Sequence, residues 1–140
     1  MTTKIAIATD HRGINEKTSL IQKIISMGYE AINLGADEET AVDYPDYAKK
    51  VVDCVASGEA DYGVLICGSG IGMSIAANRN PKIRAAIAYN NDIARLCRQH
   101  NNANVLVLGV SFIDNPEELL EIFLTTEFEG GRHAKRVEKL

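Results

Sequence analysis

The chain has 140 residues, 46% of them hydrophobic, and a formal net charge of −4 at pH 7, a length that allows one well-filled core and predicts a single domain over residues 1–140. The acidic balance excludes the basic footprint of a nucleic-acid-binding protein, and no run approaches the roughly 20 apolar residues of a membrane span. Since residues 1–13 also lack the zones of a secretory signal, we expect a soluble cytoplasmic protein whose partners include neither nucleic acid nor membrane.

Short runs of apolar and β-branched residues alternate along the chain with longer amphipathic runs, which predicts a parallel sheet covered by helices on both faces. In chain order, we expect strand 4–9, helix 15–28, strand 30–35, helix 44–57, strand 63–67, helix 71–79, strand 84–89, helix 91–100, strand 104–109, helix 115–126 and a short basic helix at 132–139. Gly28 is placed to end the first helix, and Asp114 or Asn115 to cap the helix that Pro116 begins. The pattern indicates an α/β fold, a Rossmann-like three-layer αβα sandwich with a five-stranded parallel sheet.

Polar residues follow the first and third predicted strands. Asp10 and His11 come after strand 4–9, and Cys67 ends strand 63–67 ahead of a glycine-rich loop. In open parallel sheets, ligands bind beyond the carboxyl ends of the strands, commonly between strands 1 and 3, so we expect the two clusters to lie side by side. The alternative is that Asp10 caps the first helix and that His11 is merely exposed.

The glycine-rich loop GSGIG lies between a strand and a helix. Its glycines allow a ligand to approach the backbone closely and allow positive φ, and its amides would face an anion at a helix N-terminus. The predicted anion site consists of Gly68, Ser69, Gly70, Ile71 and Gly72. The loop is not a P-loop, since no Lys-Ser/Thr follows it, and it departs from GxGxxG because position 73 is Met. A tight turn whose glycines serve packing alone is the alternative.

Three cysteines, Cys54, Cys67 and Cys97, show no CxxC spacing, so we expect free thiols and no metal site. Cys54 and Cys97 lie in helical patterns, as core side chains do. Cys67 differs, because backbone amides at a helix N-terminus favour the thiolate, which would make it a usable base. Covalent attack by the sulfur stays open as well, although no histidine is close in sequence.

Further candidates for substrate binding lie outside these clusters. Arg132 and Arg136 are four residues apart, which suits two guanidinium groups closing on one phosphate, although cations there would also complement a helix dipole. His100 and Asn101 stand at a predicted helix end, where an ordinary C-cap would also explain them. Tyr44 opens a helix as a lid or a cap.

The predicted topology separates His100 from the other candidates. His100 ends a helix just before a strand and so lies near the amino edge of the sheet, whereas Asp10 and Cys67 lie at the carboxyl edge. A strand of about five residues spans roughly 17 Å, too far for one imidazole to cross. If His100 serves the site, we expect it to come from the neighbouring subunit of a twofold homodimer with composite active sites. Whether two such dimers pair further stays open.

Six sequence blocks occur in this order along the chain: ATDHRG, DYPDYA, CGSGIGMSIAANR, RAAIAYN, RQHNNANVLVLG and EGGRHAKRV. Together they resemble the ribose-5-phosphate isomerase B family, which also contains the galactose-6-phosphate isomerase subunits, over essentially the whole chain. The resemblance implies one sugar-phosphate isomerase domain on a Rossmann-like dimer. It also implies interconversion of D-ribose 5-phosphate and D-ribulose 5-phosphate through an enediolate, in the pentose phosphate pathway, with no cofactor and no metal.

The resemblance also implies roles for the residues after the third strand. Cys67 resembles the base that removes the C2 proton, and Ser69 the residue that helps to move a proton between O1 and O2. The amides of 68–72 resemble the anion hole for the enediolate. Some members lack the cysteine and use a glutamate at the place of Met73, so this chain is similar to the cysteine branch.

Ring opening and phosphate binding are implied in the same way. His100, with Asp10 nearby, resembles the acid that opens the furanose ring. The implied phosphate clamp consists of His11, Arg132 and Arg136. Many relatives also carry an arginine where this chain has Ser111, so phosphate binding is expected to rest more heavily on the clamp.

Two other functions stay open. One is a hexose 6-phosphate isomerase acting on allose or galactose phosphate, although the retained DH, HNNAN and GRHxxRV patterns favour the pentose enzyme. The other is a non-catalytic nucleotide-binding module on the same fold, which would use the glycine loop for phosphates and leave Cys67 idle.

Overall fold

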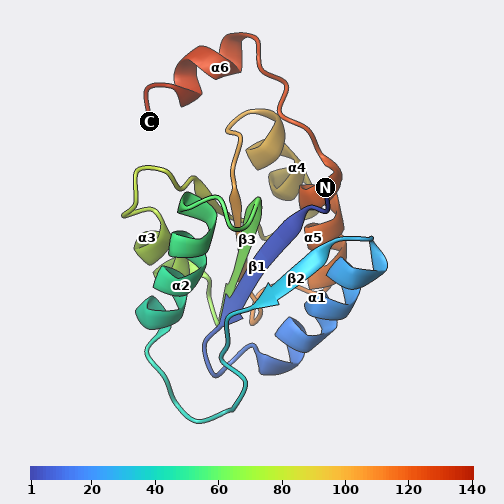
Figure 1. Ribbon diagram of the computed structural model, residues 1–140, viewed down its shortest axis with the longest axis vertical. Helices are drawn as coiled ribbons and strands as arrows, with labels where there is room; N and C mark the ends of the chain where they lie inside the picture. The colour runs from blue at the N-terminus through green and yellow to red at the C-terminus, as the bar shows by residue number, and fades with distance from the viewer.

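The computed structural model describes all 140 residues and shows a parallel sheet with helices on both faces (Figure 1). The elements are β1 (Lys4–Thr9), α1 (Ile14–Ser26), β2 (Glu30–Asn33), α2 (Tyr44–Ala56), β3 (Tyr62–Cys67), α3 (Ile71–Ala77), β4 (Ala85–Ile87), α4 (Asn91–Gln99), β5 (Val105–Gly109), α5 (Pro116–Thr125) and α6 (Arg132–Val137). Every predicted strand and helix is present, with ends that differ by a few residues. Strand β2 stops before Gly35, whose φ of 94° turns the chain.

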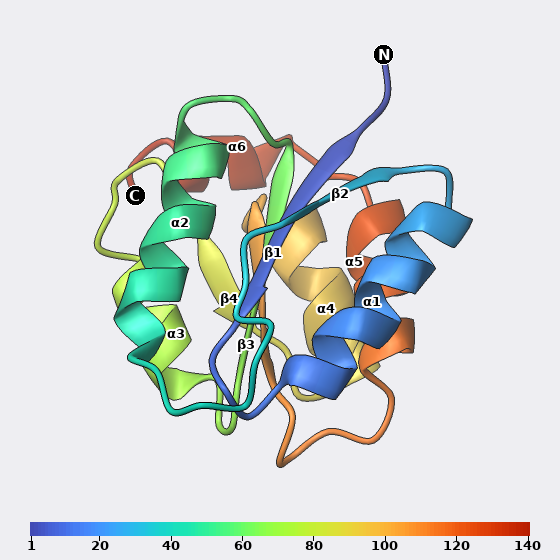
Figure 2. The ribbon, with the colours of Figure 1, turned by 60° about the horizontal axis from the view of Figure 1, so that its bottom comes forward.

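The strand order is β2-β1-β3-β5-β4, and all neighbours pair in parallel. The crossovers after β1 and β3 leave toward opposite edges of the sheet, so the predicted switch point between strands 1 and 3 is confirmed. Helices α1, α4 and α5 cover one face and α2 and α3 cover the other, as Figures 1 and 2 show. The three-layer αβα sandwich is thus confirmed.

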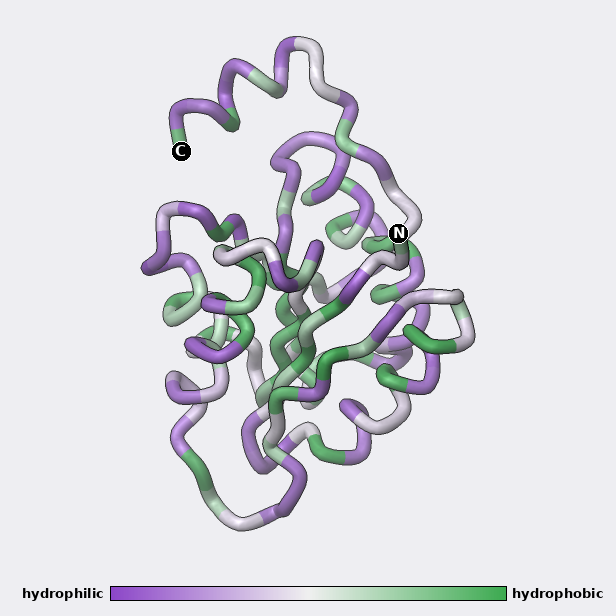
Figure 3. Tube along the Cα trace, viewed as in Figure 1, coloured by the Kyte–Doolittle hydropathy of each residue, from purple (hydrophilic) through white to green (hydrophobic).

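The central strands are buried on both faces. Ile5 and Ile7 pack with α1, α4 and α5, whereas Ala6 and Ala8 pack with α2 and α3. Such strands read as continuous apolar runs, and Figure 3 shows hydrophobic residues gathered along them. Helix α6 is mostly hydrophilic and stands away from the two cores. None of the helices combines the length and the apolar character that a membrane crossing requires.

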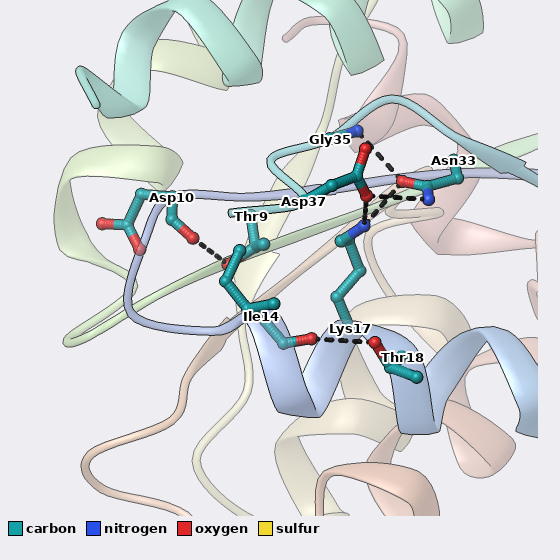
Figure 4. Close-up of polar contacts among 8 residues, drawn as sticks. All are labelled: Thr9, Asp10, Ile14, Lys17, Thr18, Asn33, Gly35 and Asp37. Carbon is teal, nitrogen blue, oxygen red and sulfur yellow. Dashed lines mark hydrogen bonds and ion pairs between the residues drawn. The ribbon is translucent and has the colours of Figure 1, made fainter. Parts of the chain in front are cut away.

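A buried lysine fastens the segment after β2 to α1. Only 2% of the Lys17 side chain is exposed. Its ammonium donates to Asn33 Oδ1 at 2.7 Å and to Asp37 Oδ1 at 2.6 Å (Figure 4). Asn33 Oδ1 also accepts from the Gly35 N–H at 3.0 Å. The hydrogen bond from Lys17 lowers the pKa of Asp37, so the ionised carboxylate is the form that the fold favours.

Replacing Asp37 with alanine is expected to lower the free energy of unfolding by about 1–3 kcal/mol at pH 7, because it removes an acceptor from a buried ammonium. A lowered folded-state pKa gives stability that is full above the ordinary value of 3.8 and is lost as the pH falls through the folded value. The difference from wild type, measured by urea unfolding, should therefore shrink below pH 3.8. Asp53→Ala breaks only an exposed pair with Lys49 and serves as the control. Equal stability of Asp37→Ala and wild type at pH 7 would refute the role of the contact.

Candidate active site

The carboxyl ends of β1 and β3 meet at one edge of the sheet. Thr9 pairs with Ile66, and the Asp10 N–H donates to the Ile66 carbonyl at 3.2 Å. A pocket of about 320 Å³ opens at this edge. The predicted residues that line it are Asp10, Tyr44, Cys67, Gly68, Ser69 and Gly72. The two polar clusters therefore lie side by side, as predicted.

Cys67 is the thiol of this pocket. It is 6% exposed, and its Sγ accepts a hydrogen bond from the Gly70 N–H at 3.1 Å. The sulfur is thus held as an acceptor, the role in which it would take a proton. Cys54 and Cys97 lie in the two cores, where burial raises the pKa of Cys54 and raises that of Cys97 to about 11. All three are free thiols, as predicted.

Gly70 and Gly72 of the loop must be glycine for different structural reasons. Gly70 caps α3 with a φ of 85°, which a side chain rarely adopts. A Cβ at Gly72 would lie 2.6 Å from Cε1 of Tyr44, whose ring packs over the loop. Gly72 therefore makes room for the Tyr44 ring, so the alternative of glycines that serve packing explains this residue. Tyr44 itself is the first residue of α2 and forms part of the pocket wall.

The backbone amides of the loop are divided between internal bonds and the pocket. The Gly70 N–H donates to Cys67, and the Ile71 N–H donates to Ser69 Oγ at 3.1 Å. The expectation that all the amides of 68–72 face an anion is therefore wrong for these two, because the loop uses them to hold its own side chains. The N–H groups of Gly68, Ser69 and Gly72 have no protein acceptor. These three amides could receive an anion.

Asp10 and His11 are held by the turns beside them. Asp10 is 7% exposed, and its Oδ1 accepts from the Arg12 N–H at 2.9 Å. The N-cap of α1 is Gly13, with no side-chain cap bond, so the alternative that Asp10 caps the helix is wrong. His11 is half-buried rather than merely exposed, and its Nδ1 accepts from the Val42 N–H at 3.3 Å.

The other predicted residues lie at the opposite end of the sheet. Figures 1 and 2 both show α6 beyond the amino ends of the strands, away from the loop between β3 and α3. These residues are His100, Asn101, Arg132 and Arg136. His100 is the C-cap of α4, and Asn101 lines a second pocket of about 390 Å³. Arg132 and Arg136 are exposed and form no ion pair.

This placement confirms the prediction that His100 lies near the amino edge of the sheet. A strand as long as β3 spans roughly 20 Å, so His100 does not lie near Asp10 within one chain. Arg132 and Arg136 lie in α6, at the end of the sheet opposite to Cys67. A single chain therefore carries two halves of the predicted site at its two ends.

The amino-end half contains a histidine that the sequence did not point to. His133 stacks on His100, with ring centroids 4.2 Å apart and 13° between the planes. Its side chain is 7% exposed, and its Nε2 has no hydrogen-bond partner. Burial, together with the neighbouring His100 and Arg132, lowers the pKa of His133 despite the opposing Glu129 carboxylate. The neutral ring is thus the form that suits this stack.

These two histidines and Glu129 offer ligand atoms within 4.8 Å of one another. A metal ion must lie along the in-plane lone pair of each imidazole that binds it. In stacked rings those lone pairs run in nearly parallel planes, so they do not converge on one ion unless the stack opens. The cluster therefore does not fit a metal centre in this arrangement.

Three further residues line the Cys67 pocket: Arg12 and Phe112, which the sequence did not single out, and Ser111, which it indicated only as the position where relatives carry an arginine. Arg12 directly follows the Asp10-His11 pair, and the other two follow β5, whose carboxyl end lies at the same sheet edge. The strand-end rule that located Cys67 could have located all three. His133 had no such signal, because its burial depends on the fold of the tail against α4.

Comparison with known proteins gives consistent matches over the whole chain. Residues 5–140 match the family model described as Ribose/Galactose Isomerase. The chain is 41% identical to ribose-5-phosphate isomerase B of Escherichia coli over 139 residues, which cover 98% of this chain and 93% of that one. The structure of ribose-5-phosphate isomerase B from Clostridium thermocellum gives a TM-score of 0.95 at 45% identity and covers 98% of this chain and 94% of that one. The structure of the Mycoplasma genitalium ribose-5-phosphate isomerase B with bound ribulose-5-phosphate gives a TM-score of 0.93 at 38% identity, with coverage of 99% and 94%.

Proposed function

The chain belongs to the ribose/galactose isomerase family, and from that premise we propose that it interconverts D-ribose 5-phosphate and D-ribulose 5-phosphate in the cytoplasm, as one domain over residues 1–140. The observation that carries the proposal is Cys67 beside the unpartnered amides of Gly68 and Ser69 in one pocket. The bound ribulose-5-phosphate named for the Mycoplasma genitalium relative supports a pentose phosphate as substrate.

The proton transfer needs a base and hydrogen-bond donors, and no redox cofactor. The Cys67 thiolate removes the C2 proton of the open-chain aldose, and the electron pair moves onto O1. The Gly68 and Ser69 N–H groups stabilise that oxygen of the enediolate. The Ser69 hydroxyl passes a proton from O2 to O1. The Cys67 thiol, whose proton exchanges with solvent while the enediolate persists, donates a proton to C1, which yields the ketose.

Ring opening and phosphate binding require the groups at the amino end of a second copy. His100 of a partner donates a proton to the furanose ring oxygen, while Asp10 accepts the proton of the anomeric hydroxyl, so the ring C–O bond breaks to leave an aldehyde. Arg132 and Arg136 of that partner close on the phosphate together with His11. A twofold pairing gives two such composite sites from one self-complementary interface.

Exposed apolar side chains near the pocket support this pairing. Ile71 and Ile75 stand on one side of α3 and are 54% and 61% exposed. Tyr89 and Phe112 pack edge to face with centroids 6.4 Å apart and are 44% and 68% exposed. The Tyr89 hydroxyl donates to the Ser69 carbonyl at 2.9 Å, which places this apolar surface at the glycine loop. An apolar rim on a monomer marks a contact surface, and a second copy is the occupant that also completes the site.

One assay separates the candidate functions. The purified protein is given ribose 5-phosphate, allose 6-phosphate and galactose 6-phosphate, and each ketose is measured with a coupled enzyme, while ATP binding is followed by calorimetry. We expect the highest kcat/KM with ribose 5-phosphate and no ATP binding. Faster turnover of a hexose phosphate would reassign the substrate, and ATP binding without turnover would favour the nucleotide-binding module.

A further inference from the structure

On the basis of the proposed function, we propose that Arg12 binds the phosphate of the substrate from the same chain that supplies Cys67. Arg12 is the one cationic side chain that lines the Cys67 pocket. Its guanidinium makes no hydrogen bond and no ion pair within the protein, and the residue is exposed. The Asp10 carboxylate accepts from the backbone N–H of Arg12 and leaves the guanidinium free.

The local fold directs this side chain into the pocket. The hydrogen bond from the Arg12 N–H to Asp10 Oδ1, at 2.9 Å, closes a turn directly after β1. The next residue, Gly13, lies so close to Thr9 and Ile66 that a Cβ would overlap them. The turn therefore lies flat against β3, and Arg12 reaches across to Gly68. A Cβ at Gly68 would lie 3.0 Å from Arg12 Nη1 and 3.2 Å from Arg12 Cδ.

The surroundings suit a phosphate dianion. The Ser111 hydroxyl, after the end of β5, approaches Gly68 as Arg12 does, and its Oγ lies 3.7 Å from where a Cβ at Gly68 would be. A guanidinium with a hydroxyl beside it offers several donors to one tetrahedral anion, and the planar fork of arginine matches two of its oxygens. Without Arg12, the pocket wall holds the Asp10 carboxylate and no compensating cation. Arg132 and Arg136 bring charge only from another chain, so Arg12 is the group that attracts the phosphate to the thiol-bearing half.

The effect on kinetics follows from where the phosphate sits. The phosphate does not react, so the contact between Arg12 and the phosphate is the same in the ground state and the transition state. Loss of this contact therefore raises KM and leaves kcat unchanged. A charge-assisted contact of this kind corresponds to roughly 10- to 100-fold in affinity. Arg12→Ala is therefore expected to raise KM for ribose 5-phosphate about 10- to 100-fold, with kcat within about threefold of wild type. The inhibition constant of inorganic phosphate should rise by a similar factor.

A relocated charge distinguishes binding from a structural role. In the double variant Arg12→Ala/Ser111→Arg, the new guanidinium extends from position 111 toward the space beside Gly68 that Arg12 occupies in the wild type. Part of the lost affinity for phosphate should therefore return. Lys49→Ala removes one positive charge from an exposed pair on α2 and should leave all constants unchanged. Circular dichroism confirms that each variant is folded.

Each outcome decides the assignment. An unchanged KM and phosphate inhibition constant in Arg12→Ala, a fall in kcat at constant KM, or no recovery in the double variant would overturn it. If wild type converts no ribose 5-phosphate, the proposed function fails by itself. Calorimetric titration with inorganic phosphate then still tests Arg12, because binding that weakens in Arg12→Ala supports the site and binding that does not refutes it.

Discussion

Cys67→Ala is expected to lower kcat for ribose 5-phosphate by about 100- to 10,000-fold, with little change in KM, because general acid-base groups contribute on this scale. The variant keeps the amides of Gly68 and Ser69, which have no protein acceptor, and keeps the charged groups proposed for the phosphate. Substrate binding should therefore survive while proton transfer is lost. Steady-state kinetics with stopped-flow detection of the ketose measures both constants.

The other two cysteines provide matched controls. Cys54→Ala and Cys97→Ala remove core thiols outside the pocket, so kcat should stay near the wild-type value. Burial raises the pKa of both thiols, so an alkylating reagent should modify Cys67 before either of them, and ribose 5-phosphate should protect Cys67. Near-normal turnover in Cys67→Ala would contradict the assignment of the base.

Mixing two inactive variants is expected to restore activity. Cys67→Ala retains a working His100, and His100→Asn retains a working Cys67. If each site combines Cys67 of one chain with His100 of the other, a mixed dimer has one intact site and one doubly defective site. Random exchange makes half of the dimers mixed, so about a quarter of the wild-type activity should return. The measurement is turnover after subunits are exchanged in mild urea and refolded together.

A second mixture shows whether the recovery reports shared sites. Asp10 and Cys67 line the same pocket in one chain, so the mixture of Cys67→Ala with Asp10→Ala contains no intact site in any pairing. It should stay inactive. Recovery in this control, or no recovery in the first mixture, would show that His100 does not serve the Cys67 pocket of a partner.

Local sequence patterns predicted the helices and strands because capping residues, glycines and apolar periodicity decide where these elements begin and end. Asn115 caps α5 by accepting from the Glu118 N–H at 3.1 Å, directly ahead of Pro116, as the cap pattern indicated. Gly28 follows α1 with a φ of 87°, the left-handed turn expected of a glycine there. Periodicity and strand-end rules together predict Cys67 and His100 at opposite edges of the sheet.

Contacts between distant segments account for what the sequence did not predict. Lys17 carries a charge and reads as a solvent-exposed position, but the segment around Asp37 folds over it and supplies its acceptors. His133 reads as part of a basic surface helix, but the tail packs against the C-terminal end of α4, where the Glu129 N–H donates to the Gln99 carbonyl at 3.0 Å and His133 stacks on His100. The hydrogen bond from the Gly70 N–H to Cys67 Sγ could not be predicted from the sequence either, because it depends on the particular conformation of the loop.

Solvent deuterium provides the most direct test that this chain moves a proton through an enediolate. Wild-type protein is incubated with ribose 5-phosphate in D₂O, and the product is followed by proton NMR. A thiolate that removes the C2 proton exchanges it with solvent, so we expect ribulose 5-phosphate that carries deuterium at C1. Absence of ketose, or ketose with no deuterium at C1, as a direct hydride shift from C2 would give, would contradict the account.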